Sequence, residues 1–211
     1  MNREAASMVA RLPNPPHISG TENIPLQGPA AIAANHYQRR GLWIAWPGAV
    51  ITNAVAARRE DNQEMHWLVT GGLRWQQWRQ SGAVVPLTRF LFAAMARAYQ
   101  MSAVPLDDVA GQARAVRRWL RWLRQGEVAG IFPEGLAGRG GVLGEAEDGF
   151  EPLCHLLQRA NIPIVPAGVW ERDRQIVLRF GQPVSGATAD EVMKRIGALL
   201  PPELQPPVAS R

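Results

Sequence analysis

The sequence predicts an α/β fold: a single domain with a central, mostly parallel or mixed sheet flanked by helices. Short apolar or β-branched runs alternate with amphipathic helical patterns along the chain, and this alternation is typical of βαβ units. The length of 211 residues suits one compact core better than two. We therefore expect one domain over residues 1–211, with its core at about 17–183 and proline-rich tails at both ends.

Each strand and helix is indicated by its own hydrophobic spacing. Short apolar runs predict strands at 30–34, 67–70, 104–106, 128–132, 162–169 and 175–180. Apolar residues at three- and four-residue intervals predict helices at 42–59, 73–80, 87–100, 109–125, 150–160 and 189–200. Two prolines, Pro163 and Pro166, indicate an edge strand or an irregular ladder at 162–169, because proline lacks the N–H that a ladder uses.

The composition narrows the class of partner and compartment. The net charge is +5, and all but one of the 23 basic residues are arginine, which favours polyanions such as phospholipid headgroups, nucleic acid or phosphorylated ligands. The one cysteine, Cys154, excludes an intramolecular disulfide, and the N-terminal residues lack the apolar centre of a secretory signal. The uncharged stretch 41–57 is shorter than a spanning helix of roughly 20 residues. We expect a cytoplasmic protein.

The expected helix 109–125 is strongly basic on one side. Arginines recur there at three- and four-residue spacing, and apolar residues form the opposite line. Arginine beside tryptophan also occurs at 74–79, a combination that suits a lipid headgroup boundary, although a solvated helix face is an equal alternative. No nucleic-acid-binding motif accompanies the charge, so we expect no nucleic-acid partner. The side chains expected to contact an anionic membrane are Arg114, Arg117, Arg118, Arg121, Trp75 and Trp78.

Three segments stand out at the ends of predicted strands, where α/β folds place their ligands; one is the proline-containing segment 162–169, and the other two carry ionisable side chains. His36 follows the strand 30–34 and can act as a general base near neutral pH, or serve only a structural role. Glu134 follows the strand 128–132 and precedes a glycine-rich loop. The other histidines, His17, His66 and His155, show no metal-ligand spacing, so we predict no metal and no cofactor.

The order of several short blocks resembles the glycerolipid acyltransferases of the lysophosphatidate acyltransferase type. These blocks are Gly20-Thr21-Glu22-Asn23-Ile24-Pro25, Asn35-His36, Phe132-Pro133-Glu134-Gly135 and the segment 162–169 with its Val-Pro-x-Gly pattern. The resemblance covers roughly residues 17–183. It implies an O-acyltransferase of phospholipid biosynthesis that moves a fatty acyl group from acyl-CoA or acyl carrier protein to a lipid hydroxyl. It also implies a peripheral protein at the cytoplasmic face of the membrane.

The resemblance assigns roles to individual residues. His36 matches the general base of the family, which takes the proton of the acceptor hydroxyl as that oxygen attacks the thioester carbonyl. Glu134 matches the family's glutamate, which helps bind the acceptor; its other reading is a carboxylate that binds backbone N–H groups of the glycine-rich loop. The residues expected to bind acceptor or acyl donor are Asn35, Arg39, Phe132, Pro133, Gly135 and Arg139.

The chain departs from the family at charged positions. The family carries an aspartate five residues after the histidine, where it orients the imidazole, and this chain has Gly41. An arginine that holds the acceptor phosphate is replaced by Asp108, and Glu147 and Asp148 follow the Pro-Glu-Gly block. These charges would repel a phosphate, so we expect an acceptor other than glycerol 3-phosphate or lysophosphatidate. The carboxylates considered as substitutes for the aspartate are Glu60, Asp61, Glu64 and Glu134.

Two functions therefore remain open. One is an active acyltransferase with a divergent acceptor. The other is a catalytically impaired relative that acts as a lipid-binding or membrane-associated module. A carboxylate on Nδ1 of His36 beside an open groove would favour catalysis, whereas a groove filled by Arg39, Arg40 or Trp43 would favour the second. A serine hydrolase is a distant third alternative, because the chain has no Gly-x-Ser-x-Gly elbow.

Overall fold

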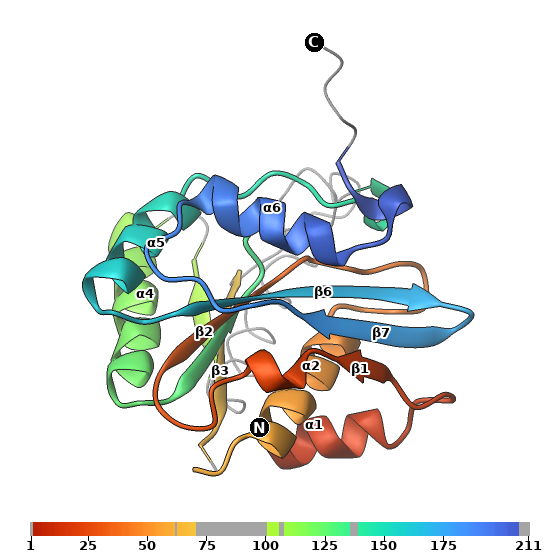
Figure 1. Cartoon of the computed structure of the whole chain (residues 1–211). Helices are drawn as coiled ribbons and strands as arrows, with labels where there is room; N and C mark the ends of the chain where they lie inside the picture. Colours follow the sequence, from red (N-terminus) through yellow and green to blue (C-terminus); the bar gives the residue numbers. More distant parts are fainter. Residues whose placement is uncertain (1, 62, 71–100, 106–107, 136–138, 207–211) are drawn as a thin grey trace, which may run out of the picture.

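A mixed sheet of seven strands forms the centre of the computed structural model, which describes residues 2–61, 63–70, 101–105, 108–135 and 139–206 (Figure 1). The strands are β1 (His17–Ser19), β2 (Ala30–Ala34), β3 (Met65–Thr70), β4 (Ser102–Val104), β5 (Val128–Ile131), β6 (Ile164–Arg172) and β7 (Gln175–Phe180). Their order is β1-β7-β6-β2-β5-β3-β4, and only β6 and β7 pair antiparallel. The α/β architecture expected from the sequence is confirmed.

Helices cover both faces of the sheet. They are α1 (Asn2–Val9), α2 (Ala45–Arg58), α4 (Val109–Arg124), α5 (Phe150–Arg159) and α6 (Ala189–Leu199). Figure 1 shows α1 and α2 on one side of the β6–β7 hairpin and α5 and α6 on the other. None of these helices is long and apolar enough to cross a membrane, as judged over the part of the chain that the structure describes.

Amphipathic spacing explains why α4 and α6 lie where they do. On α4 the side chains of Trp119 and Leu123 are buried against β3, β4 and β5, while its arginines face outward. Helix α6 begins at a capping box, in which Thr188 and Glu191 satisfy each other's backbone N–H groups. Val192 of α6 is then buried in the core.

Most predicted elements have the expected bounds to within three residues, and the strands 30–34 and 175–180 match at both ends. The predicted helices 73–80 and 87–100 lie outside the described residues. Helix α1 was not predicted; it packs against α2 and buries Ala5. Both α1 and α6 lie outside the expected core of 17–183, although they pack against it.

Strand β6 corrects the edge-strand alternative, because it lies between β2 and β7 inside the sheet. The carbonyl oxygen of Pro166 accepts a hydrogen bond from the N–H of Gly181 at 2.8 Å, one residue beyond the end of β7. The N–H and C=O of one strand residue point to the same side. The donor that Pro166 lacks would therefore face the point where β7 ends, so the internal strand tolerates this proline.

The parallel register places two strand ends side by side. Strands β2 and β5 pair in parallel, with Ala33 opposite Ile131. The residues that follow these strands, Asn35-His36 and Phe132-Pro133-Glu134, therefore leave the same edge of the sheet next to each other. The sheet topology thus brings together two blocks that are about a hundred residues apart in the sequence.

Candidate active site

Glu134 binds the backbone on which His36 lies. The N–H of His36 donates to Glu134 Oε2 at 2.5 Å, and the N–H of Gly144 donates to Glu134 Oε1 at 2.7 Å. The residue is 6% exposed. Burial raises the pKa of the Glu134 carboxyl, and the two N–H donors act in the opposite direction. Of the two roles left open for Glu134, binding of backbone N–H groups is seen, and acceptor binding stays a prediction.

Aromatic side chains hold the His36 imidazole. Its ring meets the ring of Phe132 edge-on, with centroids 5.4 Å apart and an interplanar angle of 67°. Phe132 in turn stacks on Trp67 at 4.6 Å, and the indole N–H of Trp67 donates to Thr52 Oγ1 on α2 at 3.0 Å. Nothing in the apolar strand 67–70 indicated that Trp67 would support the site. A column of packed groups therefore runs from α2 to the imidazole.

No carboxylate reaches the His36 imidazole within the part of the chain that the structure describes. Its Nδ1 atom is buried and has no hydrogen-bond partner there. Of the carboxylates considered as substitutes, Asp61 is bound by the guanidinium of Arg59, and Glu134 binds backbone N–H groups. Burial lowers the pKa of His36 below the ordinary value of 6.5, so the ring is neutral at pH 7. A neutral imidazole can accept a proton.

The side chain of Asn35 joins this segment to β6. Its Nδ2 donates to the carbonyl of Val169 at 2.8 Å, and its Oδ1 accepts from the N–H of Val169 at 2.7 Å. Asn35 is 1% exposed. Both polar atoms of the amide are therefore used within the protein, and the expected ligand contact of Asn35 stays a prediction.

Arg39 continues the connection to β6 and begins a tight turn. Its Nε and Nη2 donate to the two carboxylate oxygens of Glu171 at 2.6 and 2.5 Å. Arg39 and Leu42 exchange backbone hydrogen bonds of 3.1 and 2.9 Å, and Gly41 between them has a φ of 85°. Position i+2 of a type II turn requires such a φ, which favours glycine. This turn occupies the position of the family's aspartate.

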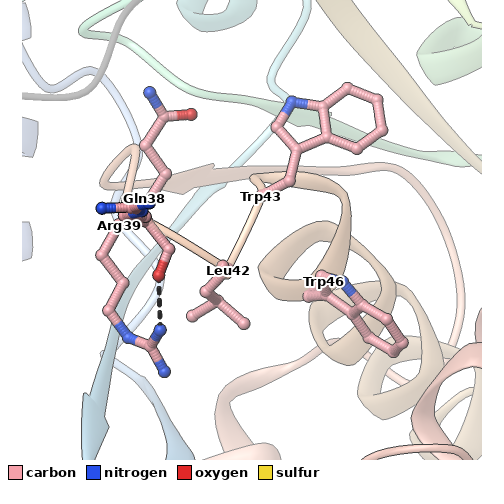
Figure 2. A pocket seen from close by; sticks show the side chains of 7 residues that line it. Gln38, Arg39, Leu42, Trp43 and Trp46 are labelled. Atoms are coloured by element: carbon pink, nitrogen blue, oxygen red, sulfur yellow. Dashed lines mark hydrogen bonds between the residues drawn. The ribbon is translucent and has the colours of Figure 1, made fainter.

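An open hollow of about 600 Å³ lies along this segment. The first residue that lines it, Gln38, comes two positions after His36 in the sequence. Figure 2 shows Gln38 and Arg39 on one side of it and Trp43 and Trp46 on the other, with Leu42 between them. Trp43 is 48% exposed. The volume is in the range of small-molecule sites, roughly 300–1,000 Å³. These side chains line the hollow and leave it open. Arg40 and Gly41 complete its lining.

The remaining residues predicted for the site either have contacts within the protein or lie outside the described part. Pro133 is buried, and its carbonyl accepts from the N–H of Glu147 at 2.9 Å. The side chain of Glu147 occupies the space beside Gly135, 2.9 Å from where a β-carbon would lie. The side chain of Arg139 and the residues Trp75 and Trp78 lie outside the described part. Among the residues that are described, no group of three His, Cys, Asp or Glu side chains could hold a metal ion.

The basic side of α4 is exposed. Asp108, which precedes α4, forms an exposed ion pair with Arg114 at 3.0 Å. The tryptophans of this helix point inward: Trp119 is buried, and Trp122 stacks on His66 at 4.0 Å. Four of the side chains predicted to contact a membrane lie on this helix and are exposed: Arg114, Arg117, Arg118 and Arg121.

Comparison with known proteins identifies the family. The profile of the family described as "Acyltransferase" matches residues 16–170, which include His36 and Glu134. No curated protein matches the chain. Among solved structures, the chain is similar to the crystal structure of the 1-acyl-sn-glycerophosphate (LPA) acyltransferase PlsC from Thermotoga maritima, with a TM-score of 0.60 and 16% identity. The match covers 94% of this chain and 76% of that one, and it shows a shared fold. The chain therefore belongs to the acyltransferase family.

Proposed function

We propose that this acyltransferase moves a fatty acyl group from acyl-CoA or acyl carrier protein to a lipid hydroxyl other than that of glycerol 3-phosphate, in phospholipid metabolism. The observation that carries the proposal is the imidazole of His36. Its pKa is lowered by burial, its Nδ1 has no partner within the described residues, and the segment that follows it lines an open hollow from Gln38 onward. These properties suit a general base.

Apart from the two substrates, the reaction needs only one proton acceptor, which the protein supplies. His36 takes the proton of the lipid hydroxyl while that oxygen attacks the thioester carbonyl carbon. The tetrahedral intermediate then collapses, the C–S bond breaks, and the proton passes from His36 to the leaving thiolate sulfur. His36 is neutral again at the end. The neighbouring Phe132 ring limits the rotation of the imidazole during these steps.

Two acidic positions that the resemblance assigns to acceptor binding support an acceptor without a free phosphate. Asp108 stands where the resemblance places a cation; it is exposed, and its ion pair with Arg114 offsets part of its charge. Asp148 is exposed as well. A phosphate close to these carboxylates would be repelled. Neutral or cationic lipids and glycolipids fit these charges better.

Release of free CoA from long-chain acyl-CoA, with and without a total lipid extract, tests the function. Only multiple turnovers count, because Cys154 could accept one acyl group. That thiol is a weak acceptor, since it is 2% exposed and burial raises its pKa to about 12. Lipid-dependent turnover is expected, and a labelled acyl chain would identify the acceptor. No turnover with acyl-CoA or acyl carrier protein would refute the proposal.

A lipid-binding module without catalysis is the second candidate. The observation that favours it is the missing carboxylate at Nδ1 of His36 among the described residues. In serine proteases the loss of the corresponding aspartate costs about 10⁴ in kcat. The same assay separates the two functions: binding of labelled lipid without any turnover would select the module.

The pH dependence provides a second prediction. We expect kcat/KM to rise with pH along one acid limb, because protonated His36 cannot accept the hydroxyl proton. Burial lowers the pKa of His36, so the midpoint of that limb should lie below 6.5. The midpoint is measured from initial rates of CoA release between pH 5 and pH 8. The lipid is saturating, and acyl-CoA is kept below its KM so that the rates report kcat/KM for acyl-CoA. A midpoint above 6.5 would contradict the burial of a neutral base.

We further propose that the chain acts as a peripheral protein at the cytoplasmic face of the membrane, bound through the exposed arginines of α4. Vesicles rich in anionic lipid should then bind it better than neutral vesicles, and salt should weaken the binding. Arg117→Gln combined with Arg121→Gln should reduce binding about tenfold or more, since each such charge contributes about 1 kcal/mol near an anionic surface.

The matched control for membrane binding removes the same charge elsewhere. Arg172 and Arg174 are exposed at the β6–β7 turn, so Arg172→Gln with Arg174→Gln changes the net charge equally. Vesicle co-sedimentation of both double variants is compared. Equal binding by the two variants would remove α4 as the membrane-binding surface.

A further inference from the structure

The ion pair between Arg39 and Glu171 has two parallel bonds and joins an exposed guanidinium to a largely covered carboxylate. Two parallel bonds of 2.6 and 2.5 Å join the guanidinium and the carboxylate, and a third donor, Nη1, binds the carbonyl of Arg40 at 2.7 Å. The Glu171 side chain is only 9% exposed, whereas that of Arg39 is 47% exposed. A carboxylate buried to this degree needs its cation, because an unpaired buried charge is strongly unfavourable.

This pair fixes the turn that follows His36. Arg39 is the first residue of the turn, and its backbone exchanges two hydrogen bonds with Leu42. Through Glu171 the turn is tied to β6, a central strand that also holds Asn35 through Val169. The segment is therefore attached to the same rigid strand on both sides of His36.

The orientation of the imidazole depends on these backbone attachments. Within the described part of the chain its Nδ1 has no hydrogen-bond partner, so no side chain there fixes the ring by a polar contact. The orientation of the ring is then set by the Phe132 ring and by the backbone on either side. Glu134 holds that backbone at the His36 N–H, and Arg39 holds it three residues later. Release of either end would let the imidazole tilt.

We propose that Arg39 and Glu171 are a positioning pair, which holds the His36 imidazole in its reactive orientation where the family has an aspartate and this chain has Gly41. The proposal rests on the proposed function for its kinetic part. It assigns Arg39 a role different from the ligand contact expected from the sequence. A ligand contact would act on binding, whereas positioning of the base acts on the chemical step.

Steady-state kinetics of two single variants and their combination test the pair. Arg39→Met and Glu171→Gln should each lower kcat about tenfold or more, with KM for the acyl donor within about twofold of wild type. The double variant should be no worse than the single variants, because both changes remove the same bond. Asp190→Asn, which breaks the exposed ion pair with Lys194, is the control and should leave kcat unchanged.

A spectroscopic readout makes the test independent of turnover. The ¹⁵N signals of the His36 ring, assigned by their loss in His36→Ala, should be sharp in the wild type. They should broaden or shift in Arg39→Met and Glu171→Gln, as the ring samples several orientations. If the wild type shows no turnover, the proposed function fails, and the ring signals alone decide the role of the pair.

Three results would overturn the proposal. One is an unchanged kcat and unchanged ring signals in both single variants. Another is a raised KM with kcat unchanged in Arg39→Met, which would indicate direct contact with a ligand. The third is a double variant whose losses multiply, since independent effects are additive in free energy. If Arg39→Met fails to fold, Arg39→Lys keeps the charge without the two parallel bonds and is tested by the same measurements.

Discussion

Replacing His36 by alanine is expected to lower kcat/KM for acyl transfer by about 10²–10⁴-fold, the usual contribution of a general base. The fold should persist, because the bond to Glu134 comes from the backbone N–H, which alanine retains. Multiple-turnover release of CoA in the presence of lipid gives the rate. An unchanged unfolding temperature of the same preparation would show that the lost activity does not come from unfolding.

The matched control for His36→Ala is His155→Ala. His155 lies on the exposed side of α5, where its ring is 59% exposed and pairs with Glu151 at 3.2 Å. Its removal should leave the rate unchanged. Equal rates for wild type and His36→Ala would show that another group accepts the proton, and the role of His36 as base would be withdrawn.

Glu134→Gln should damage both stability and activity. The carboxylate accepts two backbone N–H bonds, from His36 and from Gly144, with one oxygen each. Glutamine offers a single acceptor oxygen, and its NH₂ group would face the second N–H donor. A buried donor left without a partner costs about 1–3 kcal/mol, so the free energy of unfolding should fall by that amount.

The activity of Glu134→Gln should fall as well, because the backbone N–H of His36 loses an anchor on the β5 side. Urea unfolding measures the loss of stability, and CoA release measures the loss of activity. Glu145→Gln is the control, since Glu145 is exposed in the same loop. Wild-type stability in Glu134→Gln would show that the two N–H groups find other partners, and the bracing role of Glu134 would then be wrong.

The elements with the most uniform hydrophobic pattern were the most predictable. Strand β2 consists of five apolar residues and is fully buried, so both of its ends were correctly placed. Helix α1 was missed because it buries little, with Ala5 its one buried residue, and its docking on α2 depends on a surface distant in sequence. Prolines suggested an edge for β6, because local sequence cannot show that Pro166 faces the end of β7.

The site was predictable where its residues directly follow strands. His36 and Glu134 come from adjacent parallel strands, so the expected sheet already brought them together. Glu171 was not predictable, since it lies 132 residues from its partner Arg39 and just beyond the segment that matches the family. Trp67 could not be distinguished from any other apolar strand residue, because strand periodicity does not indicate which side chains support a catalytic group.

The turn at Gly41 also limits which side chains this position accepts. Gly41→Asp would bring back the residue type of the family, but at a φ of 85°, where a side chain is strained. A β-carbon there would lie 3.5 Å from Nη1 of Arg39. A carboxylate at this position would lie beside the guanidinium that Glu171 binds. Restoring the family's residue type at this position would therefore strain the turn and disturb the contact between Arg39 and Glu171.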